Sequence, residues 1–264
     1  MKEIALKWYK KLGFPATWDA EFYNILNNFD GKEVLHVTDF DIKKHTPQEA
    51  LIYFLYFCEE LEVKYKERGI GEDILFDTLS DILVWVNTYK SIYKKLGLEE
   101  CDWLKVHLSF NLFKLGRLQF RMGTFKKDYP KINAKLGDNV MEIHIPETGK
   151  LDIEDCIKSI ERAKGFFAKY FPEFNYEYFS CNSWLLDRGL LEMLNEQSNI
   201  LKFSSLFEYL SQVESDGALR YIFRWDATRE NLDKFEAKST LAKKAKEKVI
   251  NGGKFYRGFG VIKK

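Results

Sequence analysis

One stretch decides the fold, residues 139–186, which run NVMEIHIPETGKLDIEDCIKSIERAKGFFAKYFPEFNYEYFSCNSWLL. Its first segment, Val140 to Ile145, alternates apolar and polar residues and then meets Pro146, which lacks the N–H that a continuing strand needs. A helix is predicted next, because apolar residues recur every three or four positions and Asp152 can cap the first turn. Residues 176–182 are aromatic-rich and strand-like. The order strand, helix, strand predicts a βαβ crossover whose two strands are parallel and adjacent.

Helical patterns dominate the chain before this stretch. Thr46 and Pro47 are typical of an N-cap and a first helical residue, and they open a very apolar helix. Glycines at 69 and 71 end that helix, and a second long helix is predicted over residues 73–93. A short strand is predicted at residues 34–37.

The apolar period changes from helical to alternating near Leu108, which predicts a strand or hairpin around Gly116. The sequence therefore predicts a helical domain over residues 1–110 and an α/β domain with a mixed sheet over residues 111–264. The sheet is expected to include residues 110–122, 139–145, 176–182 and C-terminal strands. Residues 208–213 and 219–225 are predicted to form a hairpin, followed by a helix over 237–250 and a last strand over 254–262.

Composition excludes several classes of protein. The 264 residues are 45% hydrophobic and 31% charged with a net charge of +1, which is typical of a globular protein and gives no electrostatic reason to expect a nucleic-acid partner. The four cysteines are far apart, so neither a metal site nor a disulfide framework is predicted. No run approaches the roughly twenty apolar residues of a membrane span, and the N-terminus lacks a signal-peptide pattern. We expect a cytoplasmic protein without a membrane partner, and nothing in the sequence fixes its oligomeric state.

The loop within the crossover, PETGKL, has the context of an anion-binding loop. A strand precedes it, a helix follows it, Gly149 gives it flexibility and Lys150 supplies a cation. Glu147 and Asp152 oppose this interpretation, since their charges would repel an anion at short range. The sequence leaves two alternatives open, a phosphate-binding loop and a structural turn.

Two residues at the ends of the crossover strands are candidates for catalysis. His144 ends the first strand and can act as a general base, although a packing role is also common for a strand histidine. Cys181 ends the second strand and can act as a nucleophile if a partner lowers its pKa, or it is a small buried hydrophobe. Both are predicted at the carboxyl edge of the sheet, where ligands bind in α/β folds.

Polar groups beside these residues are candidates for binding. Asn182, Ser183 and Trp184 follow Cys181 and offer an amide, a hydroxyl and an indole, a pattern that equally fits a strand end capped into a helix. Arg117 can grip a phosphate with two hydrogen bonds, or it lies on a solvated strand face.

Several separated blocks of sequence, taken in order, resemble bacterial acyltransferases with a helical N-acyltransferase N-terminal domain and a GNAT-like C-terminal domain. The blocks are DTLSDILVW (77–85), LGRLQF (115–120), HIPETGKL (144–151), FFAKYFPE (166–173), FSCNSWLLD (179–187), SNILKF (198–203) and STLAKKAKEKVINGGKF (239–255). The resemblance implies a GNAT-like sheet in the second half and acyl transfer from acyl-CoA, as co-substrate, to an unidentified small-molecule acceptor, which we expect to be an amine.

The same resemblance implies that the pantetheine arm of acyl-CoA lies between the two crossover strands, with its phosphates near residues 148–150. The residues predicted to contact this co-substrate are Arg117, Ile145, Glu147, Thr148, Gly149, Lys150, Asn182, Ser183 and Trp184. The chain departs from conventional GNAT enzymes because its crossover loop lacks the Q/R-x-x-G-x-G/A phosphate motif, and KERGIG at 66–71 follows a helix where that motif follows a strand. A non-catalytic GNAT-like ligand-binding or scaffold protein is the alternative.

Overall fold

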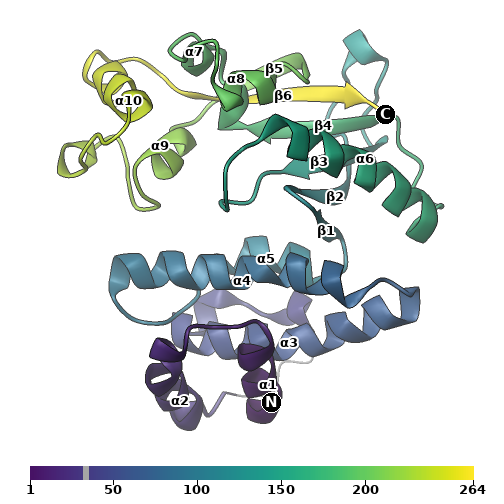
Figure 1. The fold of residues 1–264 in the computed structure, drawn as a ribbon, viewed down its shortest axis with the longest axis vertical. Helices are drawn as coiled ribbons and strands as arrows, with labels where there is room; N and C mark the ends of the chain where they lie inside the picture. Colours follow the sequence, from purple (N-terminus) through teal and green to yellow (C-terminus); the bar gives the residue numbers. More distant parts are fainter. Residues whose placement is uncertain (32–35) are drawn as a thin grey trace. The chain divides into compact units, whose positions relative to one another are not determined.

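The computed structural model describes residues 1–31 and 36–264 and contains two compact units (Figure 1). The first unit comprises residues 1–115 and 146–148, and the second comprises residues 116–145 and 149–264. The division between the two units falls between Leu115 and Gly116, whereas the sequence predicts a domain boundary after residue 110. That boundary stays a prediction.

In the residues of the first unit that the structure describes, the elements are helices and one strand at the end of the unit. Its elements are α1 (Lys2–Lys11), α2 (Asp19–Asn28), α3 (Pro47–Arg68), α4 (Glu72–Tyr93), α5 (Cys101–Leu108) and β1 (Leu112–Leu115). The start of α3 is as predicted, since the Thr46 hydroxyl accepts from the backbone N–H of Glu49 and the Glu49 carboxylate accepts from that of Thr46. Gly69 closes the helix with φ +71°, a conformation that glycine adopts without strain.

The strand predicted at residues 34–37 falls largely outside the described residues. Within them, Val37 begins a short 3-10 helix, η2 (Val37–Asp39).

Aromatic side chains fill the core of the first unit. Tyr9 stacks on Phe22 with ring centroids 3.8 Å apart, and Phe40 meets Phe54 edge to face at 5.3 Å. Trp8, Tyr53 and Phe54 are fully buried. The high aromatic content of the sequence is therefore used in this core, which offset and edge-to-face contacts stabilise.

The second unit contains the crossover. Its elements are β2 (Leu118–Thr124), β3 (Asn139–His144), α6 (Ile153–Tyr170), β4 (Tyr178–Ser183), η5 (Trp184–Leu186), α7 (Arg188–Leu191), α8 (Asn199–Ser204), β5 (Glu208–Glu214), α9 (Gly217–Ile222), α10 (Thr240–Ile250) and β6 (Tyr256–Lys263). Its strands lie in the order β2-β3-β4-β6-β5, and only β3 and β4 pair in parallel (Figure 1). The predicted βαβ crossover with adjacent parallel strands is confirmed.

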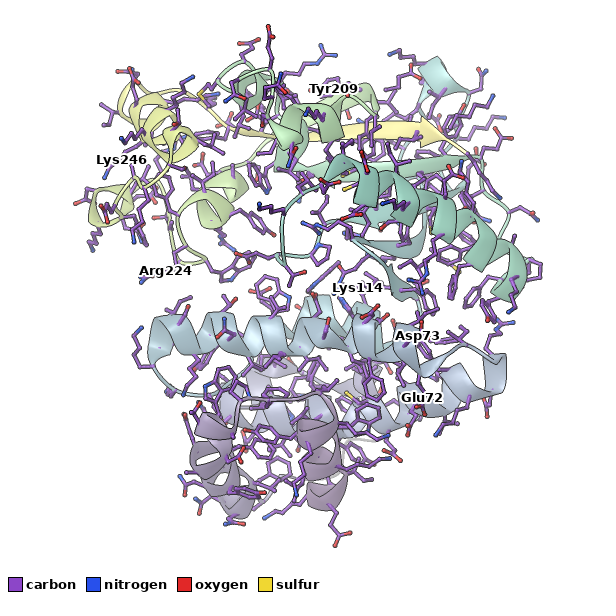
Figure 2. The ribbon with its side chains drawn as sticks, viewed as in Figure 1. Glu72, Asp73, Lys114, Tyr209, Arg224 and Lys246 are labelled. Atoms are coloured by element: carbon purple, nitrogen blue, oxygen red, sulfur yellow. The ribbon has the colours of Figure 1, made fainter. Side chains whose placement is uncertain are left out.

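The predicted hairpin between residues 208–213 and 219–225 is wrong. Strand β5 pairs with β6, and residues 217–222 form helix α9. The helix places Ala218 and Leu219 in a buried cluster with Leu190, Leu232 and Phe255, an arrangement that an alternating strand would break. Lys246, labelled in Figure 2, donates to the Phe235 carbonyl and joins α10 to the preceding segment.

Removing the ring of Phe179 should destabilise the second unit severely. Phe179 on β4 is fully buried and contacts Phe120 and Tyr176, with centroids 5.9 and 5.3 Å away. We expect Phe179→Ala to lower the free energy of unfolding by about 3–5 kcal/mol in urea titrations, because the cavity cannot refill.

The matched control is Ile157→Ala on α6, where the side chain is 43% exposed. This control should change the free energy of unfolding by no more than about 0.5 kcal/mol. Equal effects of the two substitutions would contradict the packing described for β4.

Candidate functional site

The register of the sheet sorts the candidate residues onto two faces. Strands β3 and β4 pair at Met141 with Phe179, Glu142 with Ser180 and Ile143 with Cys181. Since side chains alternate along a strand, His144 and Asn182 share a face with Glu142 and Ser180. Ile143 and Cys181 occupy the opposite face, which is apolar and buried.

The polar face carries a group of charged residues around His144. On β2, Gln119 lies opposite His144 and Arg121 lies opposite Glu142. His144 Nε2 lies 3.5 Å from Glu142 Oε2, and Arg121 Nη1 lies 3.6 Å from the same oxygen. Burial opposes ionisation of Glu142, but the neighbouring His144 and the charge of Arg121 hold its pKa below the ordinary value. The carboxylate is therefore ionised near neutral pH.

The connection between β2 and β3 covers the other end of this polar face. Phe125, Ile132 and Ala134 pack there with Val140 and Val261. Val140 belongs to the first half of β3, whereas His144 ends that strand. The apolar cover therefore lies over the amino end of β3, and the ionisable groups lie toward its carboxyl end, the edge at which α/β sheets bind ligands.

Cys181 lies on the other face from His144, so the structure does not bring the two predicted catalytic side chains together. Only 1% of Cys181 is exposed, and burial raises the pKa of its thiol well above the ordinary value. A protonated, enclosed thiol has the properties of a small core hydrophobe. Its predicted catalytic role stays untested.

The side chain of Asp152 caps the start of helix α6. Asp152 Oδ1 accepts from the backbone N–H groups of Glu154, at 2.9 Å, and Asp155, at 3.3 Å. These N–H groups are the ones that an anion would use at a helix N-terminus. The acidic first turn therefore favours the structural-turn interpretation for this part of the crossover loop.

Arg117 joins the crossover loop through its side chain. Its Nε donates to the Lys150 carbonyl at 2.8 Å, and its backbone N–H donates to Ser159 Oγ on α6 at 2.7 Å. Gly116 turns the chain just before it, with φ +87°, and a Cβ there would lie 2.9 Å from Ser159 Oγ. Arg117 is thus held against Lys150 of the crossover loop, and the predicted contact of Arg117, Gly149 and Lys150 with a phosphate stays a prediction.

Three predicted binding residues lie at the end of β4 and directly after it, and they differ in exposure and contacts. Asn182 is exposed, and Ser183 Oγ accepts from the backbone N–H of Leu185, the capping role that the sequence also allowed. Trp184 is half-buried and stacks on Tyr221 at 5.8 Å.

The remaining loop residues lie at the changeover between the units. Ile145 follows β3 in the second unit and is half-buried, whereas Glu147 and Thr148 are counted with the first unit. Glu147 keeps solvent access, and partial desolvation together with the charge of Asp81 raises its pKa.

Sequence reasoning missed a buried polar cluster in the first unit. Asp81 accepts from the indole N–H groups of Trp103 at 2.9 Å and Trp85 at 3.3 Å, and it lies 3.2 Å from His107 Nε2. Burial opposes ionisation of Asp81, yet these donors hold its pKa below the ordinary value. Asp81 and Trp85 are four residues apart on α4, so their i, i+4 spacing was the available signal.

Glu142 was also missed, although the alternation in NVMEIH places it two residues before His144 on the same strand face.

In the described residues, no cluster of histidine, cysteine or acidic side chains has the arrangement of a metal site. None of the described helices is both long and apolar enough to cross a membrane.

Two family descriptions match the chain in succession. The N-acyltransferase N-terminal domain matches residues 7–110, and the GNAT-like C-terminal domain matches residues 112–262. This chain belongs to that acyltransferase family. The family membership confirms the predicted family, and the helical unit followed by a mixed-sheet unit confirms the predicted fold class.

Solved acyltransferase structures resemble the chain. One, in complex with CoA and 10C-teicoplanin, is 26% identical with a TM-score of 0.72, over 82% of this chain and 66% of that one. Another, in complex with decanoyl-CoA, is 26% identical with a TM-score of 0.72, over 92% of this chain and 74% of that one. A third, in complex with decanoyl-CoA and teicoplanin, shares the fold at 22% identity with a TM-score of 0.78, over 99% and 88%. No curated protein matches the chain.

The thiols of the native protein should be unreactive. Cys58, Cys101, Cys156 and Cys181 are all buried, and burial raises the pKa of each. A raised pKa keeps a thiol protonated as the pH approaches the ordinary value of about 8.5, so little thiolate forms. We expect Ellman's reagent at about that pH to label the native protein far more slowly than the protein unfolded in guanidinium. Rapid native labelling that peptide mapping assigns to Cys181 would contradict this placement.

Proposed function

We propose that this protein transfers an acyl group from acyl-CoA to a small-molecule amine. The observation that carries the proposal is the short parallel pairing of β3 with β4. Its register ends at Ile143 and Cys181, while His144, Asn182 and Ser183 continue to the carboxyl edge. Backbone groups beyond the last registered pair can receive an extended ligand such as a pantetheine arm, in the manner of an added strand.

Two further observations support acyl-CoA as the donor. The family is one of acyltransferases, and two solved acyltransferases at 26% identity hold CoA or decanoyl-CoA. Arg117 and Lys150 supply cations for the phosphates of the donor beside the crossover loop. Since Asp152 occupies N–H groups at the start of α6, we propose that these side chains and the loop backbone hold the phosphates, and that the helix N-terminus does so less.

The chemistry requires one proton acceptor and no covalent intermediate on the protein. The amine nitrogen attacks the thioester carbonyl carbon, and the C–S bond breaks as CoA leaves as the thiolate. His144 accepts the proton that the amine nitrogen loses and returns it to the leaving thiolate. Backbone N–H groups at the strand ends stabilise the oxygen that becomes negative in the tetrahedral intermediate. His144 is the residue that we propose as the base, because it lies on the polar face whereas Cys181 does not.

A non-catalytic ligand-binding protein is the second candidate. The capped start of α6 favours it, because the acidic first turn lacks the open phosphate site of conventional GNAT enzymes. Binding without transfer would identify this second candidate.

Two assays on the intact chain test the proposal. Thermal unfolding is measured with CoA and with acetyl-, octanoyl- and decanoyl-CoA, since a ligand that binds the folded state raises its stability by RT ln(1 + [L]/Kd). Release of the CoA thiol is then measured with a panel of primary amines. We expect at least one acyl-CoA to raise the unfolding temperature and at least one amine to accelerate thiol release. Stabilisation by an acyl-CoA without transfer to any amine would support the non-catalytic ligand-binding protein. No stabilisation by CoA or any acyl-CoA would reject the acyl-CoA site.

Replacing His144 should remove transfer and spare binding. General-base catalysis contributes roughly 10²–10⁴-fold, so His144→Ala should lower kcat by an amount in that range. The thermal shift with acyl-CoA should persist, because the pantetheine arm contacts the backbone. His36→Ala is the control, since that side chain is 62% exposed in the helical unit and lies 3.4 Å from Glu60. Transfer by His144→Ala at the parent rate would show that another group accepts the proton.

A further inference from the structure

We propose that Glu142 is a positioning residue that holds the imidazole of His144 in the tautomer with hydrogen on Nε2, so that the proton-accepting lone pair is on Nδ1. The consequence for catalysis rests on the proposed function, because only acyl transfer gives His144 a proton to accept. The tautomer itself is a property of the resting protein. It is measured without substrate, and the two claims can therefore fail separately.

The geometry assigns the contact to one pair of atoms. Glu142 and His144 are two residues apart on β3, so both side chains project from the same face of the sheet. His144 Nε2 lies 3.5 Å from Glu142 Oε2, and the side chains are 30% and 24% exposed, respectively. An ionised carboxylate only accepts hydrogen bonds, so the ring nitrogen facing it carries the hydrogen. At 3.5 Å the contact is electrostatic, and the negative carboxylate favours hydrogen on the ring nitrogen that faces it, which leaves the lone pair on the other nitrogen.

Arg121 keeps this carboxylate ionised and oriented. Its Nη1 lies 3.6 Å from the same Oε2, from the position on β2 directly opposite Glu142. The charge of Lys126 acts in the same direction, and the pKa of Glu142 stays below the ordinary value despite burial. Gln119 on β2 lies opposite His144, and Ser180 on β4 lies opposite Glu142.

Gly123 makes room for the carboxylate. A Cβ at this position would lie 2.5 Å from Glu142 Oε1 and 2.7 Å from its carboxyl carbon, closer than real side chains approach. The φ of Gly123 is outside the left-handed region, so the backbone itself tolerates a larger residue. Glycine at 123 is therefore required by the place of the Glu142 side chain, and Gly123→Ala displaces that carboxylate without changing its chemistry.

Imidazole nitrogen shifts in ¹⁵N-labelled protein test the tautomer. The chain has four histidines, and loss of a signal in His144→Gln assigns the one of interest. Spectra are recorded as the pH is raised to about 8.5, and the tautomer is determined where the nitrogen shifts no longer change with pH. We expect the parent protein to show Nε2 protonated and Nδ1 unprotonated at His144. Glu142→Ala and Gly123→Ala should both move the shifts toward a mixture of tautomers.

Matched controls separate this role from general damage to the sheet. Glu214→Ala removes an exposed strand glutamate that pairs with Lys254, and Gly165→Ala adds a methyl group where no atom lies within 4 Å. Neither should change the His144 shifts. Glu142→Gln keeps an oxygen that can accept from Nε2–H, so it should retain more of the parent tautomer than Glu142→Ala.

Kinetics connect the tautomer to the reaction. Glu142→Ala should lower kcat by about 10–100-fold, with KM for acyl-CoA changed by less than about threefold, because an orienting group acts on the base and leaves donor binding intact. Glu142→Gln should recover part of the lost kcat. Parent-like His144 shifts in both Glu142→Ala and Gly123→Ala would overturn the proposal, and so would an altered tautomer with kcat unchanged in a protein that transfers acyl groups. If Glu142→Ala does not fold, Glu142→Gln and Gly123→Ala decide the matter alone.

Discussion

The parallel pairing of β3 with β4 is the constraint on which the site depends. It joins only three residue pairs, and all other pairs of strands in the second unit are antiparallel. A parallel pair needs a long crossover, which here is α6 with the loop before it. The same pairing sends the carboxyl ends of both strands to one edge and fixes which side chains share a face. The proposed binding and chemistry depend on this single register, because a shift by one residue would move His144 to the buried face.

The two faces of the sheet differ in chemistry: one is packed in the core, and the other carries the ionisable groups. The face of Ile143, Phe179 and Cys181 is apolar, and burial there raises the pKa of the thiol. On the other face, His144 and Arg121 lower the pKa of Glu142. Burial thus keeps one potential nucleophile neutral, while a neighbouring base and cation keep a carboxylate ionised. This separation supports the proposed direct transfer over an acyl-enzyme route.

Sequence patterns predicted the crossover because its signals are local: a proline that ends a strand, an aspartate that caps a helix and an apolar stripe along α6. They failed at residues 219–225, where β6, more than thirty residues away in the chain, supplies the partner of β5 and leaves α9 free to bury Ala218 and Leu219. The sequence predicted that His144 and Cys181 end their strands at one edge, but β4 continues past Cys181 to Ser183. The face of each residue depends on the register, however, and local sequence does not encode the register of two distant strands. The positions of Glu142 beside His144 and of Gly123 beside Glu142 become evident only from that register.

Intact-protein mass spectrometry during turnover tests the central claim most directly. The protein is mixed with decanoyl-CoA, first alone and then with an accepting amine, and is quenched at intervals from the first turnover onward. Direct transfer on the polar face predicts a protein mass that stays unchanged while acylated amine and CoA accumulate together. A protein species heavier by one acyl group, formed and consumed at the rate of turnover and mapped to Cys181, would contradict the account.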